Sequence, residues 1–319
     1  MYAKDIAIVT SGALAKNGGI ITISEVFAHK ANIPLYDLAT NPAVPVLLND
    51  FQTILFSGFD ESFVELTRYL KSIGKKIAVW WHFSCACEVD SDIGKAWRAL
   101  LPLLKDHSID LFISSKKDVD KIIHDFFGIP TFFVMNNITD TSRRNLPKEG
   151  LGIYSGSSNY WIKNLYSNLY ACLMTKLHVD IIPYDSSLQG IVQNLGMEQY
   201  VTGLSERIDY EDFQSRMASR ELVSYVTFSE CAPLIPLEAL NNGVICITGN
   251  NHSYFCEDER LRSMLVVSKP DDPMSIYRSI NYALMHKFEI MERYAEWKSS
   301  YDRTQQYNFI RLFELISSL

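Results

Sequence analysis

The chain lacks the features that mark exported, membrane-spanning and disulfide-stabilised proteins. Its N-terminus carries a short β-branched run with an acidic residue before it, which is unlike a secretory signal. No apolar stretch approaches the roughly 18 to 20 residues that a membrane-spanning helix needs. The 6 cysteines are scattered over 319 residues and form no disulfide framework. These absences predict a cytoplasmic protein without a transmembrane segment; peripheral contact with a membrane stays compatible with them.

An excess of basic residues is also missing. The 30 Lys and Arg residues stand against 37 Asp and Glu residues, a net charge of -7, so no nucleic-acid partner is expected. Internal repeats of roughly 20 to 50 residues are absent as well. Apolar material is plentiful, because 47% of the residues are hydrophobic and 21% are charged. That composition is typical of globular proteins, and the length favours two domains.

Short apolar runs alternate with helical patterns along the whole chain. They read DIAIVT, TILFS, KIAVWW, DLFISS and TFFVM in the first half, and LGIYSG, VDIIPYD, LVSYVTF, GVICIT and MLVVS in the second. Such runs indicate parallel sheets with helices on both faces. The polar stretch 136–150 between the halves resembles a linker. We therefore predict an α/β protein with two Rossmann-like, doubly wound domains, residues 1–145 and 150–300, facing a central cleft.

The last residues, 301–319, are predicted to form a further helix. Tyr307, Ile310, Phe313 and Ile316 recur at intervals of three, which indicates one apolar face. We expect this face to pack back across the junction onto the N-terminal domain.

Two glutamates stand in an otherwise uncharged run, SECAPLIPLEALNNG. The strand pattern LVSYVTF ends just before Glu230, and Pro233 and Pro236 mark the start of a helix that includes Glu238. Gly243 is a natural end for that helix. Backbone N–H groups at a helix start attract anions such as phosphate. Carboxylates on either side of such a site can accept hydrogen bonds from sugar hydroxyls, although ordinary capping or surface glutamates would give the same spacing.

This stretch resembles the Glu-(seven residues)-Glu signature of retaining glycosyltransferases of the GT-B fold, in glycosyltransferase family 4 (group 1). Ser229, the Glu-Ala-Leu sequence at 238–240 and the strand VICITG follow the family pattern in order. The resemblance implies that Glu230 faces the donor hexose and Glu238 the ribose of the nucleotide. It also implies that backbone amides hold the donor diphosphate, at Ala232, Pro233, Leu234 and Ile235.

Two further stretches carry the resemblance. SGALAKNGGIITISEVF places Gly18 and Gly19 between the first strand and first helix, like the N-terminal glycine loop of the family. LGIYSGSSNYWIKN is similar to the segment in which a strand ends in glycine, here Gly156, and a lysine, here Lys163, neutralises the diphosphate. Without the resemblance, the glycines would indicate a tight turn and the lysine a solvated surface residue.

The chain also departs from the family pattern. An arginine commonly follows the glycine of that segment, but Ser157 stands here, so one of two usual cations is missing. A histidine commonly ends an N-domain strand, whereas ILFSGFDES offers Asp60, which could assist an acceptor hydroxyl or cap a helix. His82 ends the next strand and is a second candidate for that role.

Three other interpretations stay open. His82, Cys85 and Cys87 are potential zinc ligands, but no second cluster completes a site, so no metal site is predicted. An NAD-dependent oxidoreductase would need a Gly-x-Gly-x-x-Gly turn after the first strand, a spacing that SGALAKNGG lacks. A catalytically degenerate or non-enzymatic nucleotide- or sugar-binding protein of the same fold is the third.

The resemblance implies transfer of a hexose from a UDP- or GDP-type sugar to an acceptor hydroxyl, with retention at the anomeric carbon. It implies no cofactor and no obligatory metal, because Lys163 and helix amides would stabilise the departing diphosphate. Glu230, Lys163 and Asp60 are the candidate catalytic residues. The acceptor would be a glycan, a lipid-linked sugar or a small molecule.

Overall fold

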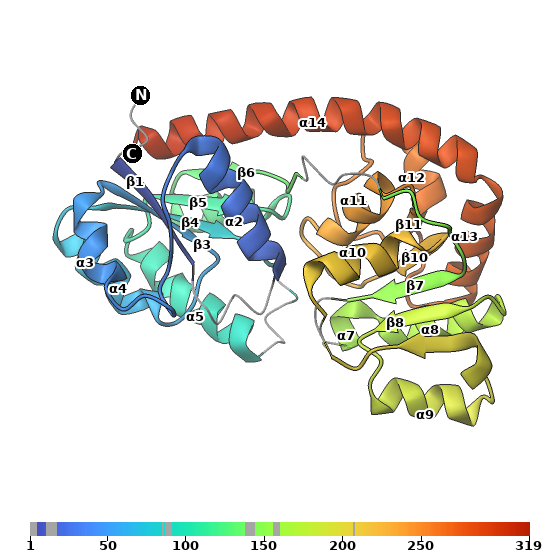
Figure 1. Cartoon of the computed structure of the whole chain (residues 1–319). Coiled ribbons are helices and arrows are strands. Elements are labelled where there is room, and N and C mark those ends of the chain that lie inside the picture. The colour runs from blue at the N-terminus through green and yellow to red at the C-terminus, as the bar shows by residue number, and fades with distance from the viewer. Residues whose placement is uncertain are drawn as a thin grey trace. The chain divides into compact units, whose positions relative to one another are not determined.

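The computed structural model describes residues 5–10, 18–84, 86, 91–137, 144–155, 160–206 and 208–319. The chain divides into two compact units. Unit 1 consists of Met1–Asn137 with Arg303–Leu319, and unit 2 of Ile138–Asp302. Each unit is built around its own parallel sheet, with helices on both faces of that sheet (Figure 1).

The sheet of unit 1 has six strands within the described ranges, in the order β2-β1-β3-β4-β5-β6. These strands are β1 (Ile6–Thr10), β2 (Leu35–Asp37), β3 (Thr53–Ser57), β4 (Lys76–Trp81), β5 (Leu111–Ser114) and β6 (Thr131–Phe133). The helices between them are α2 (Gly18–Ala31), α3 (Val44–Leu47), the 3₁₀ turn η2 (Leu48–Asp50), α4 (Phe63–Ser72), α5 (Ser91–Lys105) and α6 (Val119–Phe127). All five strand pairs are parallel.

The central strands of unit 1 form because their residues are apolar on both sides. Every residue of β1 and β3 is buried, as expected where helices cover both faces of a parallel sheet. Phe56 of β3 stacks on Phe63 of α4, with ring centroids 4.5 Å apart. This packing fixes the carboxyl ends of β3 and β4, where Ser57 and His82 lie.

The sheet of unit 2 also has six strands in the described part of the chain, in the order β12-β11-β10-β7-β8-β9. They are β7 (Leu151–Tyr154), β8 (Val179–Ile182), β9 (Val201–Gly203), β10 (Leu222–Tyr225), β11 (Ile245–Gly249) and β12 (Val266–Val267). The helices are α7 (Tyr160–Lys163), α8 (Leu165–Met174), α9 (Ser186–Asn194), the 3₁₀ turn η4 (Glu198–Tyr200), α10 (Tyr210–Ala218), α11 (Leu234–Asn241), α12 (Glu259–Leu265) and α13 (Pro273–Met285).

The register of unit 2 determines which loops meet. Leu222 of β10 pairs with Leu151 of β7 on one side and with Ile245 of β11 on the other, in both cases in parallel. The segments that follow β7 and β10 therefore leave the sheet at the same edge. Those are the segments that carry Lys163 and Glu230.

The chain ends in α14 (Lys287–Ser317), a helix of 31 residues that contributes to both units. In unit 2, Trp297 stacks on Tyr301 with ring centroids 4.5 Å apart. In unit 1, the ring of Phe309 lies 5.8 Å from that of Phe27 in α2. Within the described ranges, none of the helices combines the length and the apolar character that crossing a bilayer requires.

The predicted fold class is confirmed: the structure has two doubly wound parallel sheets and a C-terminal helix. The short strand β2 was not predicted, because its three residues carry no apolar run. The predicted apolar face of the C-terminal helix is wrong in part: Tyr307 is 57% exposed and Ile310 is 52% exposed, whereas Ile316 is buried. The buried face instead follows the wider helical spacing of Tyr301, Gln305, Phe309, Leu312 and Ile316.

Candidate functional site

Helix α11 begins without a side-chain cap. Its N-cap residue is Pro233, with φ -64° and ψ 138°, whose side chain forms no capping hydrogen bond. Pro236 in that turn has no N–H group. The N–H groups of Leu234 and Ile235 therefore lie at the positive end of the helix dipole without an intrahelical acceptor. This geometry suits a phosphate, and the helix start is the predicted one.

Lys163 and Glu230 come together beside this helix start, although 67 residues separate them in the chain. The Nζ atom of Lys163 forms an ion pair with Oε1 of Glu230, and the two side chains are only 16% and 14% exposed. The hydroxyl of Tyr225 donates to the same oxygen at 2.7 Å and accepts from Lys163 at 3.2 Å. The lysine is thus a partly buried cation in a defined cluster rather than a solvated surface residue.

Backbone contacts hold this cluster in place. The N–H of Phe228, in the loop after β10, donates to the carbonyl of Ile162 at 2.8 Å, which brings α7 to the loop that carries Glu230. Asn164 follows Lys163 with φ 52°, in the left-handed region that asparagine tolerates better than most residues. Its side-chain amide donates to the carbonyl of Val226 at 3.0 Å. Asparagine therefore fills a turn position that requires a positive φ.

The electrostatics of the cluster keep Tyr225 neutral. Burial raises the pKa of the Tyr225 phenol well above its usual value, and the charge of Glu230 adds to this effect. The phenol is therefore neutral near pH 7 and donates a hydrogen bond to Glu230. The positive charge of Lys163 is paired with the carboxylate of Glu230 before a ligand arrives.

Glu238 lies in the middle of α11 and is buried, with 4% of its surface exposed. Burial raises the pKa of its carboxyl from 4.5 to about 7, while hydrogen bonds from Tyr210 and Gln214 favour the charged form. The Tyr210 hydroxyl donates to Oε1 of Glu238 at 3.0 Å. Among the described residues, no lysine, arginine or histidine forms an ion pair with Glu238. A buried carboxylate without a cation is costly and often marks a functional position.

Three other predicted site residues belong to unit 1. Gly18 and Gly19 were predicted to lie in the loop between the first strand and the first helix. In the structure they are the first two residues of α2. The carboxylate of Asp60 accepts a hydrogen bond from the backbone N–H of Ser62 at 2.9 Å. Asp60 thus stabilises the turn ahead of α4, a role that is compatible with the predicted contact to an acceptor hydroxyl.

The remaining predicted residues divide into two groups. Gly156 and Ser157, expected beside the diphosphate, lie outside the described residues. Ala232 and Pro233 are buried in the segment that leads into α11. Within this segment, the structure places the predicted amides and both glutamates in one continuous stretch, with Lys163 brought to it from α7.

His82 follows β4 and belongs to a polar network of unit 1. Its Nε2 lies 3.0 Å from the hydroxyl of Ser57, and its ring lies 4.8 Å from that of Trp80. Burial lowers the pKa of His82 to about 3, so the imidazole is neutral near pH 7. Cys85 and Cys87, its potential partners for zinc, lie outside the described residues. Elsewhere in the described ranges, no three His, Cys, Asp or Glu side chains are arranged to hold a metal ion.

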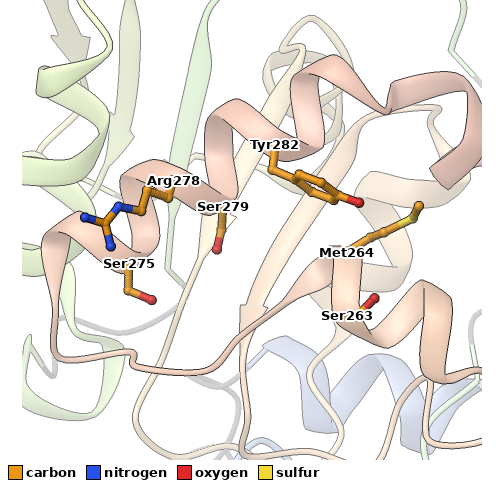
Figure 2. Close-up of a pocket in the computed structure, with 6 residues that line it drawn as sticks. All are labelled: Ser263, Met264, Ser275, Arg278, Ser279 and Tyr282. Carbon is orange, nitrogen blue, oxygen red and sulfur yellow. The ribbon is translucent and has the colours of Figure 1, made fainter.

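A separate depression lies between α12 and α13 and has a volume of about 330 Å³ (Figure 2). It is lined by Ser263, Met264, Ser275, Arg278, Ser279 and Tyr282. None of these residues belongs to α7, α11 or the loop after β10. The depression is therefore distinct from the cluster around Lys163 and Glu230.

Sequence reasoning missed the two tyrosines that contact the paired glutamates. Tyr225 is the last residue of β10, five positions before Glu230, and an aromatic residue with a hydroxyl at the carboxyl end of a buried strand was a usable signal. Tyr210 is the first residue of α10 and lies 28 positions before Glu238, so no local pattern connects them.

Comparisons with known proteins place the fold but not the family. No family model matches the chain, and no curated protein matches it in sequence. Among solved structures, the chain is similar to HepE of Anabaena in complex with UDP, with 13% sequence identity and a TM-score of 0.70. That match covers 99% of this chain and 100% of HepE.

Two further solved structures agree. The lipopolysaccharide outer core galactosyltransferase WaaB is 15% identical, with a TM-score of 0.65 over 98% of this chain and 99% of WaaB. The trehalose-6-phosphate synthase OtsA is 13% identical, with a TM-score of 0.62 over 87% of this chain and 74% of OtsA. At such low identities the likeness establishes the fold alone, and that fold is GT-B.

Proposed function

We propose that the protein is a glycosyltransferase that moves a hexose from a nucleotide-diphosphate sugar to an acceptor hydroxyl, with retention at the anomeric carbon and without an obligatory metal ion. The observation that carries this proposal is the meeting of Lys163 with Glu230 beside the uncapped start of α11. The GT-B fold and the presence of UDP in the similar structure of HepE support it.

The donor diphosphate would bind to the N–H groups of Leu234 and Ile235 and to Lys163. Phosphate would then replace Glu230 as the partner of the Lys163 ammonium group. The carboxylate of Glu230, still held by Tyr225, would become available to the hydroxyls of the hexose. Glu238 would accept hydrogen bonds from the ribose. Gly18, Gly19 and Asp60 of unit 1 are proposed to act on the donor phosphates and the acceptor.

The reaction itself needs two electrostatic tasks. The bond between the anomeric carbon and the diphosphate oxygen breaks, and Lys163 with the helix amides stabilises the charge that grows on that oxygen. The acceptor oxygen forms the new bond on the same face of the sugar, and its proton passes to the departing diphosphate. Fixed dipoles and one lysine perform the task that a metal ion performs in other transferases.

A calorimetric titration of the purified protein with UDP, GDP and NAD tests the nucleotide class. We expect binding of UDP or GDP, and no binding of NAD. Incubation with UDP- and GDP-hexoses, followed by nuclear magnetic resonance of the sugar released or transferred, reports the anomeric outcome. Binding of NAD alone would favour the oxidoreductase alternative. Nucleotide binding without turnover of any sugar would favour the catalytically degenerate protein, a reading that the preformed ion pair of Lys163 also allows.

Turnover is expected to persist in EDTA, because the proposed cation is the ammonium group of Lys163. The measurement is the initial rate before and after chelation, with manganese added back. The sequence does hold two Asp-x-Asp triplets, Asp90-Ser91-Asp92 and Asp118-Val119-Asp120, a pattern that carries metal ions in other transferases. If the rate is lost in EDTA and returns with manganese, the metal-independent mechanism is wrong, and the aspartates of these two triplets become the first ligands to test.

A further inference from the structure

Each of the two paired glutamates accepts a hydrogen bond from a tyrosine hydroxyl, but the two tyrosines differ in their setting. Tyr225, which binds Glu230, is buried within the sheet, whereas Tyr210, which binds Glu238, is 48% exposed at the first turn of α10. The buried carboxylate of Glu238 therefore lies behind a residue that solvent reaches.

The hydrogen bonding of Glu238 leaves capacity for a ligand. A carboxylate offers about four acceptor positions, and the single O–H of a tyrosine fills one of them. Glu238 forms no ion pair with a described residue, and its side-chain hydrogen bonds come from the Tyr210 hydroxyl and from Gln214, both of which lower its pKa. These two donors still leave acceptor positions free. A ligand with two neighbouring hydroxyls could supply better partners, provided that it can reach the carboxylate.

We propose that Tyr210 is a displaceable cover of Glu238, and that its hydroxyl occupies the position which a vicinal diol of the ligand takes on binding. The ribose of a nucleoside diphosphate carries such a vicinal diol. This inference rests on the proposed function, because it takes the nucleotide ribose as the partner of Glu238. It adds that the Tyr210 hydroxyl of the free protein competes with the ligand for the carboxylate of Glu238.

The start of α10 allows the side chain to move while the backbone stays. The carboxylate of Asp209 accepts from the N–H of Asp212 at 2.9 Å and so caps the helix. Arg144 forms an ion pair with Glu211 and donates to the hydroxyl of Ser215, which ties the first two turns of α10 to the segment before β7. Tyr210 therefore leaves Glu238 by rotation of its side chain, which moves a ring that is already half exposed further into solvent.

The energetic consequence is a lowered apparent affinity. The ligand exchanges one hydroxyl–carboxylate hydrogen bond for another, so part of its interaction with Glu238 only replaces what the free protein already had. Removal of the Tyr210 hydroxyl leaves the buried carboxylate short of a donor in the free state. The free state is then less stable relative to the complex, and a diol ligand should bind roughly tenfold tighter.

The test uses calorimetric titration of the full chain with UDP and with 2′,3′-dideoxy-UDP, which lacks the diol. Tyr210→Phe should bind UDP roughly tenfold tighter than the wild type and should bind the dideoxy compound with unchanged affinity. Tyr170→Phe, a change at an exposed tyrosine of α8, is the matched control and should alter neither. In a Glu238→Gln background, Tyr210→Phe should give no gain, because the carboxylate is gone.

Circular dichroism and thermal unfolding of each variant establish that it folds. If Tyr210→Phe weakens or does not change UDP binding, Tyr210 is a ligand contact or a bystander, and the inference is overturned while the proposed function stands. An equal gain for UDP and the dideoxy compound also overturns it, since the gain would not involve the diol. A wild type that binds neither UDP nor GDP overturns the proposed function, and this inference with it.

Discussion

The charge of Lys163 is balanced within the ligand-free protein by the carboxylate of Glu230. An ammonium group that is 16% exposed would otherwise be costly to hold beside the sheet, because few water molecules reach it. A diphosphate can take over as its partner without creating an unpaired charge on the lysine. The ion pair is thus a preformed site in which the diphosphate of the sugar donor replaces the carboxylate of Glu230.

Lys163→Ala is expected to reduce turnover more than any other single change at the site. Loss of a donor that is aimed at developing charge costs on the order of a hundredfold to a thousandfold in rate. The loss should appear chiefly in kcat, because the charge on the leaving diphosphate grows toward the transition state. Steady-state kinetics with a UDP- or GDP-hexose provide the measurement.

Two further variants make this test specific. Lys163→Arg keeps the charge with a different geometry and should restore part of the rate. Lys121→Ala removes an exposed lysine of α6 that forms an ion pair with Asp118, and should leave kcat unchanged. Near-normal kcat in Lys163→Ala would contradict the assignment of Lys163 as the leaving-group cation.

Glu238 should make the stability of the fold depend on pH. Burial raises its pKa in the folded protein from 4.5 to about 7. Between these values the folded state holds a proton that the unfolded state has lost, so the free energy of unfolding falls as pH rises. Across pH 5 to 8 the loss should be about 2 to 3 kcal/mol, and it should level off above the folded pKa.

Urea unfolding of the wild type and Glu238→Gln at pH 5 and pH 8 measures this dependence. The glutamine variant lacks the titrating group, so the difference between the two proteins isolates its contribution. We expect the wild type to lose stability relative to the variant as pH rises. A constant difference between the proteins would show that the carboxyl titrates normally despite its burial.

The first turn of α11 offers a test of the phosphate site through the backbone alone. Proline is favoured at the first helical position, where its missing N–H breaks no helical hydrogen bond. Pro233 already has the extended conformation that a following proline requires. Leu234→Pro should therefore preserve the helix while it removes one N–H from the proposed diphosphate site.

The expected result is weaker binding of UDP by about tenfold to a hundredfold, the worth of a hydrogen bond to a charged acceptor. Calorimetry gives the affinity, and circular dichroism reports on the helix. Leu234→Ala keeps the N–H but removes the side chain, so it controls for packing. If both variants bind UDP equally well, the amide of Leu234 does not contact phosphate.

Local patterns predicted α11 and the central strands, because their causes lie within a few residues. Prolines at 233 and 236 start the helix, and the strands of both sheets are runs of apolar residues long enough to be buried on both faces. The strand β2 has three half-buried residues and owes its place to pairing with β1. No property of LYD alone predicts that pairing.

The contacts of the site were less predictable than its residues. The spacing of Glu230 and Glu238 singled out both positions, but a hydrogen-bond partner of Glu238 is Tyr210 from a different helix. Lys163 meets Glu230 because β7 and β10 are neighbours in the sheet, which is a property of strand order. Side-chain partners across such distances follow from the fold, and a single sequence does not contain them in readable form.

The long helix α14 contributes to the cores of both units. Its first half supplies Trp297, whose ring lies 4.7 Å from that of Phe255 in unit 2. Its last residues belong to unit 1, where Phe309 packs against Phe27 and lies 6.2 Å from the ring of Trp80. One continuous helix thus contributes to two separate hydrophobic cores. A substitution near its C-terminal end should therefore destabilise only one of them.

Phe309→Ala should destabilise unit 1 and leave unit 2 intact. Truncation of a buried phenylalanine costs about 3 to 5 kcal/mol, through the lost burial and the cavity left beside Phe27 and Trp80. Hydrogen exchange followed by mass spectrometry resolves the effect, because β1, β3 and β4 report on unit 1 and β7, β10 and β11 on unit 2. Tyr307→Ala, two positions away on the exposed side, should change the exchange of neither. Faster exchange in both sheets of Phe309→Ala would instead mean that the units unfold together, with α14 transmitting the loss from one core to the other.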